Sequence, residues 1–153
     1  MESKRLADQL RRSYEGEAWH GPSLRELLDG VTAEQAAAKP LEGAHSIWEL
    51  VQHVEAWERE SLAVAGGKAF EILAGDADWP PVRETSAEAW QSTLERLEAT
   101  TRQLVAAIRE MSDERMNETA GDREFNFYFL LHGVVQHNLY HAGQIALLKK
   151  AGV

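Results

Sequence analysis

The stretch HNLYH at residues 137–141 lies in a segment, residues 125–150, whose spacing decides the predicted architecture. In this segment apolar residues recur every three or four positions, as they do on one face of an α-helix: Leu130, Val134, Ile145 and Leu148. Two histidines four residues apart on a helix differ by about 40° in rotation and by about 6 Å along the axis. His137 and His141 therefore point with the apolar stripe toward the interior, where an imidazole needs a partner. A shared metal ion, a solvent-lined groove and ordinary buried hydrogen bonds each satisfy this pattern.

Length and charge predict a single globular domain, residues 1–153, that binds neither nucleic acid nor a membrane. A chain of 153 residues can bury a sizeable core without disulfides. Its 25 acidic and 16 basic side chains give a net charge of −9, which disfavours phosphate backbones and anionic lipid surfaces. The sequence has no apolar run of membrane-spanning length and begins without a signal-peptide pattern, so we expect a cytoplasmic protein. Because cysteine is absent, any metal must be bound by imidazole, carboxylate or water.

Apolar periodicity and helix-start signals predict four long helices and no strand. The long helices are expected over residues 3–15, 46–65, 85–111 and 125–150, with a shorter helix from Ser23 and a single turn from Thr32. Capping boxes, in which a hydroxyl residue precedes Glu or Gln by three positions, mark four of these starts: Ser23–Glu26, Thr32–Gln35, Ser46–Glu49 and Thr85–Glu88. The spacing leaves open whether residues 3–30 form one kinked helix or two.

Two connections complete the predicted topology. Residues 68–84 combine glycine, proline and aspartate without any period, which is typical of a long connection. Such a connection crosses over the bundle rather than forming a tight hairpin. The polar residues 112–124 are predicted to form a second loop. The sequence therefore predicts an all-α domain, most simply a four-helix bundle with a long crossover after the second helix.

A metal ion at the histidine pair requires a third protein ligand, and His53 is the best-placed candidate. His53 lies in the middle of the predicted helix 46–65, at the edge of its apolar stripe, where a bundle brings it near the last helix. His132 lies about 140° around the helix from His137 and so faces away, while His45 precedes its helix in a loop. Three histidines without a fourth protein ligand leave an open position for water, as catalytic zinc sites do. Alternatively, each histidine is held by an ordinary hydrogen-bond partner.

Two further residues are candidates for a catalytic role. Glu49 lies one turn before His53, and it either orients that histidine or serves only in the capping box. His20, which stands beside Trp19 at a Gly-Pro break, is a candidate acid–base group or additional ligand.

Trp57 and Gln144 are candidates for substrate binding. Gln144 lies three residues after His141, where it lines a pocket or simply occupies a polar position of the bundle. Tyr140 lies between the two histidines in sequence and is expected to point away from both, toward the surface or an interface.

Two motifs resemble the DinB-like superfamily: GAHSIWEL at residues 43–50, continued by His53 and Trp57, and HxxxHxGQI at residues 137–145. The opening WHGPSL at residues 19–24 is similar to one branch of that superfamily. The resemblance implies a four-helix bundle with its crossover after the second helix. It also implies a divalent metal ion, most often zinc or nickel, held by His53, His137 and His141. Members commonly associate as homodimers through helix faces.

The same resemblance implies a metal-dependent enzyme, because characterised relatives include S-transferases and isomerases that use bacillithiol or mycothiol. A low-molecular-weight thiol and a small electrophile are then the expected partners. A hydrolase that uses the metal to generate hydroxide is the related alternative. The alternative outside catalysis is a helical dimerisation or small-molecule-binding module whose histidines are structural.

Overall fold

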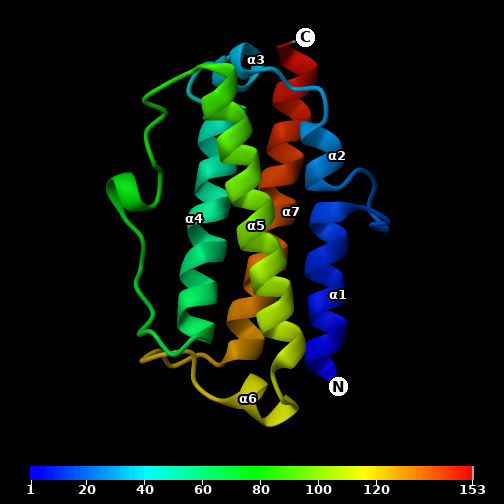
Figure 1. Ribbon diagram of the computed structural model, residues 1–153, viewed down its shortest axis with the longest axis vertical. Helices are drawn as coiled ribbons and strands as arrows, with labels where there is room; N and C mark the ends of the chain where they lie inside the picture. The colour runs from blue at the N-terminus through cyan, green and yellow to red at the C-terminus, as the bar shows by residue number, and fades with distance from the viewer. Residues whose placement is uncertain (153) are drawn as a thin grey trace.

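The computed structural model describes residues 1–152, and in that range it consists of helices and loops with one isolated β-bridge (Figure 1). The long helices are α1 (Glu2–Glu15), α4 (Ile47–Ala65), α5 (Ala87–Glu110) and α7 (Phe127–Ala151). The short ones are α2 (Leu24–Leu28), α3 (Ala33–Ala37), the 3₁₀ turn η1 (Gly75–Ala77) and α6 (Asp113–Asn117). The predicted all-α class is confirmed, and Val153, the last residue of the predicted domain, lies outside the described residues. Among the described helices, none combines the length and apolar character needed to cross a membrane.

The long helices form a four-helix bundle with a crossover, as the sequence predicted. In Figure 1, α1 and α7 run upward and α4 and α5 run downward. Helix α5 packs against α4 and α1, and α7 packs against the same two helices, so α1 and α4 lie diagonally across the bundle. The segment 66–86 returns along the whole length of the bundle from the end of α4 to the start of α5 (Figure 1). This crossover passes the middle of α4, where His53 lies.

Two apolar clusters fill the bundle, one toward each end, and leave a polar layer between them. The cluster near α3 contains Trp48 and Trp90, whose rings lie 5.0 Å apart. Their indole nitrogens donate to Thr93 Oγ1 at 3.1 Å and to the Val31 carbonyl at 2.8 Å, respectively. The cluster near α6 is centred on the fully buried Phe127. Because both clusters exclude water, polar side chains in the layer between them must find partners within the protein.

The start of α5 differs from the prediction by one residue. Ser86, rather than Thr85, is the N-cap: its Oγ accepts from the Ala89 N–H at 3.2 Å, and its carbonyl accepts the first helical bond. The predicted Thr85–Glu88 box is therefore wrong. Both hydroxyl residues have the same local capping chemistry, so only the backbone path out of the crossover distinguishes them.

The segments around α1 and α6 also refine the prediction. Residues 3–30 contain two helices, because α1 ends at Gly16, whose φ of 132° favours glycine, and α2 begins after the Ser23 cap. The predicted loop 112–124 contains α6, a short helix that the sequence pattern did not indicate. A five-residue helix is not stable by itself, and here the buried Met116 anchors it to the core.

The capping box at the start of α4 gives a first prediction. Ser46 Oγ accepts from the Glu49 N–H at 3.1 Å, and the Glu49 carboxylate accepts from the Ser46 N–H at 2.8 Å. We expect Ser46→Ala to lower the free energy of unfolding by about 1 kcal/mol, measured by urea denaturation. Ser46→Gly, which loses the same hydroxyl but suits a cap backbone, should lower it by only a few tenths of that amount. Equal stability of Ser46→Ala and the wild type would contradict this role.

Candidate metal centre

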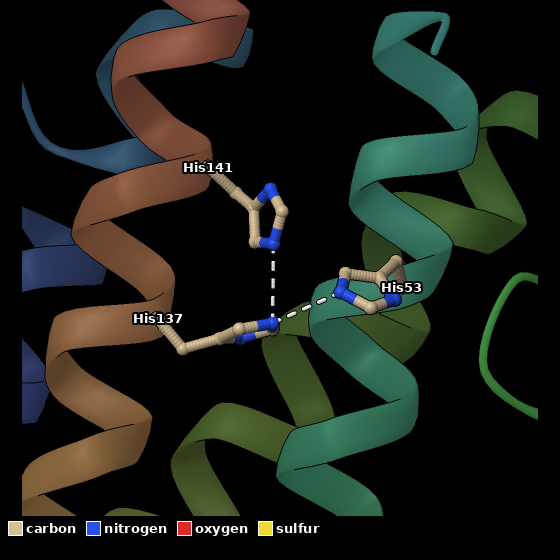
Figure 2. Close-up of side chains that lie close together, drawn as sticks. All are labelled: His53, His137 and His141. Atoms are coloured by element: carbon tan, nitrogen blue, oxygen red, sulfur yellow. Dashed lines mark hydrogen bonds between the residues drawn. The ribbon is translucent and has the colours of Figure 1, made fainter. Parts of the chain in front are cut away.

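Three imidazoles from two helices meet in the polar layer of the bundle (Figure 2). His53 comes from the middle of α4, and His137 and His141 come from successive turns of α7. His137 Nε2 lies 3.0 Å from His53 Nε2 and 3.1 Å from His141 Nε2. One ligand atom from each residue lies within 4.8 Å of the others. The structure thus brings together the three histidines that the sequence singled out.

Hydrogen bonds on the far side of two rings fix the direction of their lone pairs. His53 Nδ1 lies 2.7 Å from the Asp78 carbonyl oxygen, and His141 Nδ1 lies 2.9 Å from Gln144 Oε1. Carbonyl oxygens only accept hydrogen bonds, so both Nδ1 atoms donate. In a neutral imidazole the other nitrogen, Nε2, then carries a lone pair. Both lone pairs point at His137 Nε2.

This arrangement fits a divalent metal ion. Nitrogen ligands about 2.0–2.1 Å from a tetrahedral ion lie about 3.3 Å from one another, close to the 3.0 and 3.1 Å separations of the Nε2 atoms. Burial, followed by the neighbouring His141 and His53, lowers the pKa of His137 to about 3, and burial also lowers the pKa of His141. Low pKa values keep these rings neutral, the form that binds metals. The Nε2 atoms of the three histidines are thereby placed to share a cation.

The crossover supplies two residues that hold His53, and neither was predicted from the sequence. Trp79 stacks on His53 with ring centroids 3.8 Å apart, and it stacks on His45 at 3.6 Å. The Asp78 carboxylate accepts from Trp57 Nε1 at 2.8 Å and lies 3.2 Å from His53 Nδ1. Contacts of this kind fix the tautomer and orientation of a metal-binding imidazole. No local pattern in residues 68–84 indicates which of them reaches the histidines.

A buried carboxyl network adjoins the histidines and was not predicted either. Glu58 on α4 is 0% exposed, and its carboxylate accepts from Asn138 Nδ2 at 2.6 Å and from Thr101 Oγ1 at 2.5 Å. Burial raises the pKa of Glu58 to about 7, although these two hydrogen bonds act in the opposite direction. Asn138 directly follows His137, so the network connects the histidine cluster to α5. The sequence did carry a signal, because Glu58 follows Val54 by four residues in the apolar stripe.

A family model described as the DinB superfamily matches residues 18–145. The chain belongs to the DinB superfamily. The matched range includes His53, His137 and His141. Neither the curated proteins nor the solved structures contain a match to the chain. Together with the DinB superfamily assignment, the three-histidine cluster fits a metal-binding site.

Two of the candidate residues lie apart from the DinB-type histidine cluster. The Glu49 carboxylate caps Ser46, accepts from Lys39 Nζ at 2.8 Å and lies 3.4 Å from His45 Nδ1. Asp78, not Glu49, therefore bonds to His53. His20 is exposed and lines a surface hollow with Val135 and Leu139. These two residues of α7 lie about 200° around the helix from His137, so the structure does not bring His20 to the cluster.

The remaining candidates divide between the cluster and the surface. Gln144 bonds to His141, and the Trp57 ring centroid lies 6.3 Å from that of His137. Tyr140 is exposed, as expected for a residue that points away from the pair. His132 packs against Tyr128 with centroids 4.3 Å apart, outside the group of three.

The contact between Gln144 and His141 gives a second prediction. Gln144→Met keeps the length of the side chain but removes the acceptor for His141 Nδ1. We expect zinc affinity to fall by about 10- to 100-fold, as for other residues that orient a metal-binding histidine, while stability without metal changes little. Competition with a chelating dye measures the affinity. Gln136→Met, at an exposed position of the same helix, is the control; equal zinc affinity of the two variants would exclude the orienting role.

Proposed function

We propose that the chain is a metal-dependent enzyme of the S-transferase type, acting on a low-molecular-weight thiol and a small electrophile. The observation that carries this proposal is the convergence of the Nε2 atoms of three histidines from two helices. Three nitrogen ligands occupy only part of a tetrahedral coordination sphere, which is the arrangement of catalytic rather than structural zinc sites. Membership in the DinB superfamily supports the same conclusion.

A divalent ion bound there would supply a Lewis acid that lowers the pKa of a coordinated thiol or water at neutral pH. The protein contributes orientation and exclusion of water. Asp78 and Gln144 direct the Nε2 atoms of their histidines toward one point, and His53 and His141 are buried. Two carboxyl groups on this side of the bundle are engaged already: Asp78 bonds to Trp57, and Glu58 bonds to Thr101 and Asn138. A thiol that ionises on the metal needs less help from a general base than water does, which favours transfer over hydrolysis.

The test begins with tag-free protein purified without chelator and loaded with zinc or with nickel. Each form is incubated with an electrophile, such as 1-chloro-2,4-dinitrobenzene, and with bacillithiol, mycothiol or glutathione. We expect formation of the thioether product to require both the metal and the thiol. Hydrolysis of ester or amide substrates without any thiol would assign the hydrolase alternative. A protein that refuses both metals would refute the enzyme proposal and favour a binding module.

A further inference from the structure

An aromatic hollow lies directly beside the histidine cluster, between α4, α7 and two loops. We use this name for the depression formed by Trp57, Phe70, Phe125, Phe129, Gly133 and His137. Its volume is about 320 Å³, which falls in the range of about 300–1,000 Å³ typical of small-molecule sites. His137 belongs both to this hollow and to the cluster of Nε2 atoms. A molecule in the hollow would therefore touch a ring that forms part of the candidate metal centre.

The lining of the hollow is mostly aromatic and aliphatic, and it contains no Asp, Glu, Lys or Arg side chain. Phe70 packs edge-on against Phe125 at 5.4 Å, and Phe125 lies 5.5 Å from Phe129, which is 65% exposed at the rim. The polar group of Trp57 is already engaged, because Nε1 donates to Asp78. A charged guest would lose its hydration without gaining a partner, whereas an apolar ring would gain edge and face contacts. The lining thus selects uncharged aromatic or alkyl groups.

Gly133 keeps this hollow open. It lies in the interior of α7, one turn before His137, where glycine is less favourable than alanine. A Cβ atom at Gly133 would meet no neighbouring atom within 4 Å, so packing does not require glycine there. Any larger side chain would instead project into space that the hollow now provides. Gly143 is also surrounded by open space but lies on an exposed part of the same helix, which makes it a matched control.

We propose that the aromatic hollow binds the uncharged aromatic or alkyl portion of a small substrate whose reacting group lies at the histidine cluster. This inference rests on the proposed function of that cluster and narrows its substrate class. A larger hollow of about 570 Å³ lies between α1, α2 and α5, but it is lined by charged residues such as Arg25, Glu95 and Glu98 and by none of the three histidines. Direct contact with His137 therefore assigns the substrate to the smaller, aromatic hollow.

The first experiment tests binding without any metal. Indole is titrated into chelator-treated protein, and binding is followed by NMR chemical shifts in the wild type, Gly133→Leu and Gly143→Leu. We expect indole to perturb Trp57 and Phe129 in the wild type, and affinity to fall by about 10-fold or more in Gly133→Leu only. Absence of indole binding, or equal binding by both variants, would overturn the proposal. Circular dichroism and zinc content establish that Gly133→Leu retains the fold and the cluster.

The second experiment separates this inference from the proposed function. Cobalt-loaded protein is titrated with 2-phenylethanethiol and with ethanethiol, and the charge-transfer absorption reports thiol binding to the metal. We expect the phenyl group to raise affinity by about 10-fold or more in the wild type and to give no gain in Gly133→Leu. Equal affinity of the two thiols in the wild type would overturn the inference but leave the proposed function intact. If neither thiol binds the metal while indole still binds the hollow, the proposed function is overturned, but the binding of apolar groups by the hollow is not. A monomer–dimer shift caused only by Gly133→Leu would reassign the hollow to a contact between two copies of the chain.

Discussion

Replacing His137 with alanine is expected to abolish stoichiometric metal binding. The His137 Nε2 atom contacts both other members of the cluster, so its removal leaves two imidazoles from different helices without the nitrogen between them. Loss of a residue that merely orients a ligand lowers affinity by about 10- to 100-fold, so loss of the ligand should lower zinc affinity by more than about 100-fold. Elemental analysis of tag-free protein gives the metal content, and competition with a chelating dye gives the affinity.

The stability of the same variant provides an independent measurement. Zinc at about 100 times its dissociation constant should raise the free energy of unfolding of the wild type by about 2.7 kcal/mol. At that zinc concentration His137→Ala should show almost no increase. His132→Ala removes an imidazole from the same helix but outside the cluster, so it should behave like the wild type. A full equivalent of zinc in His137→Ala would show that the cluster is not the metal site.

Glu58→Gln is expected to produce a large change in the pH dependence of stability. Burial raises the pKa of Glu58 from 4.5 to about 7, so between these values the folded protein holds a proton that the unfolded chain releases. Stability from this group is therefore fully present below about pH 4.5 and is lost as pH rises through about 7. The shift corresponds to about 3 kcal/mol. Glutamine cannot ionise, so the variant lacks this loss of stability. The difference in free energy of unfolding between the variant and the wild type should therefore rise by about 3 kcal/mol from acidic to mildly alkaline pH.

Urea denaturation of metal-free protein from about pH 4.5 to about pH 8, the range that brackets the titration of Glu58, measures the difference. The lowered pKa of His137 gives a slope of opposite sign, with stability rising as pH rises, but both proteins share that slope and it cancels in the comparison. The amide introduced by Glu58→Gln can still accept from Asn138 and donate to Thr101, so the substitution keeps the network connected. Glu95→Gln, at an exposed position of α5, is the control. Identical pH slopes for the wild type and Glu58→Gln would refute the raised pKa of Glu58.

The features that were predictable from sequence arise from helical periodicity, which is local. The stripe around Val134 fixes which face of α7 is buried, and the four-residue spacing of His137 and His141 fixes that both project from it. A position near the apolar stripe of α4 likewise indicates that His53 faces the bundle interior. Because the repeat of an α-helix is set by the backbone, these directions are already determined before the helices pack together.

The tertiary structure decided which residues complete the site. Trp79 and Asp78 reach His53 only because the crossover runs back along α4, and a loop has no repeating geometry from which its contacts follow. For the same reason, the places of Glu49 and His20 in the chain made them candidates for the site but did not show where they lie. Glu49 contacts Lys39, and His20 lines a different surface hollow. The sequence alone therefore determined the long helices and the inward direction of the three histidines. Packing between segments distant in the chain determined how those histidines are oriented and that an aromatic hollow opens beside them, because both depend on long-range contacts.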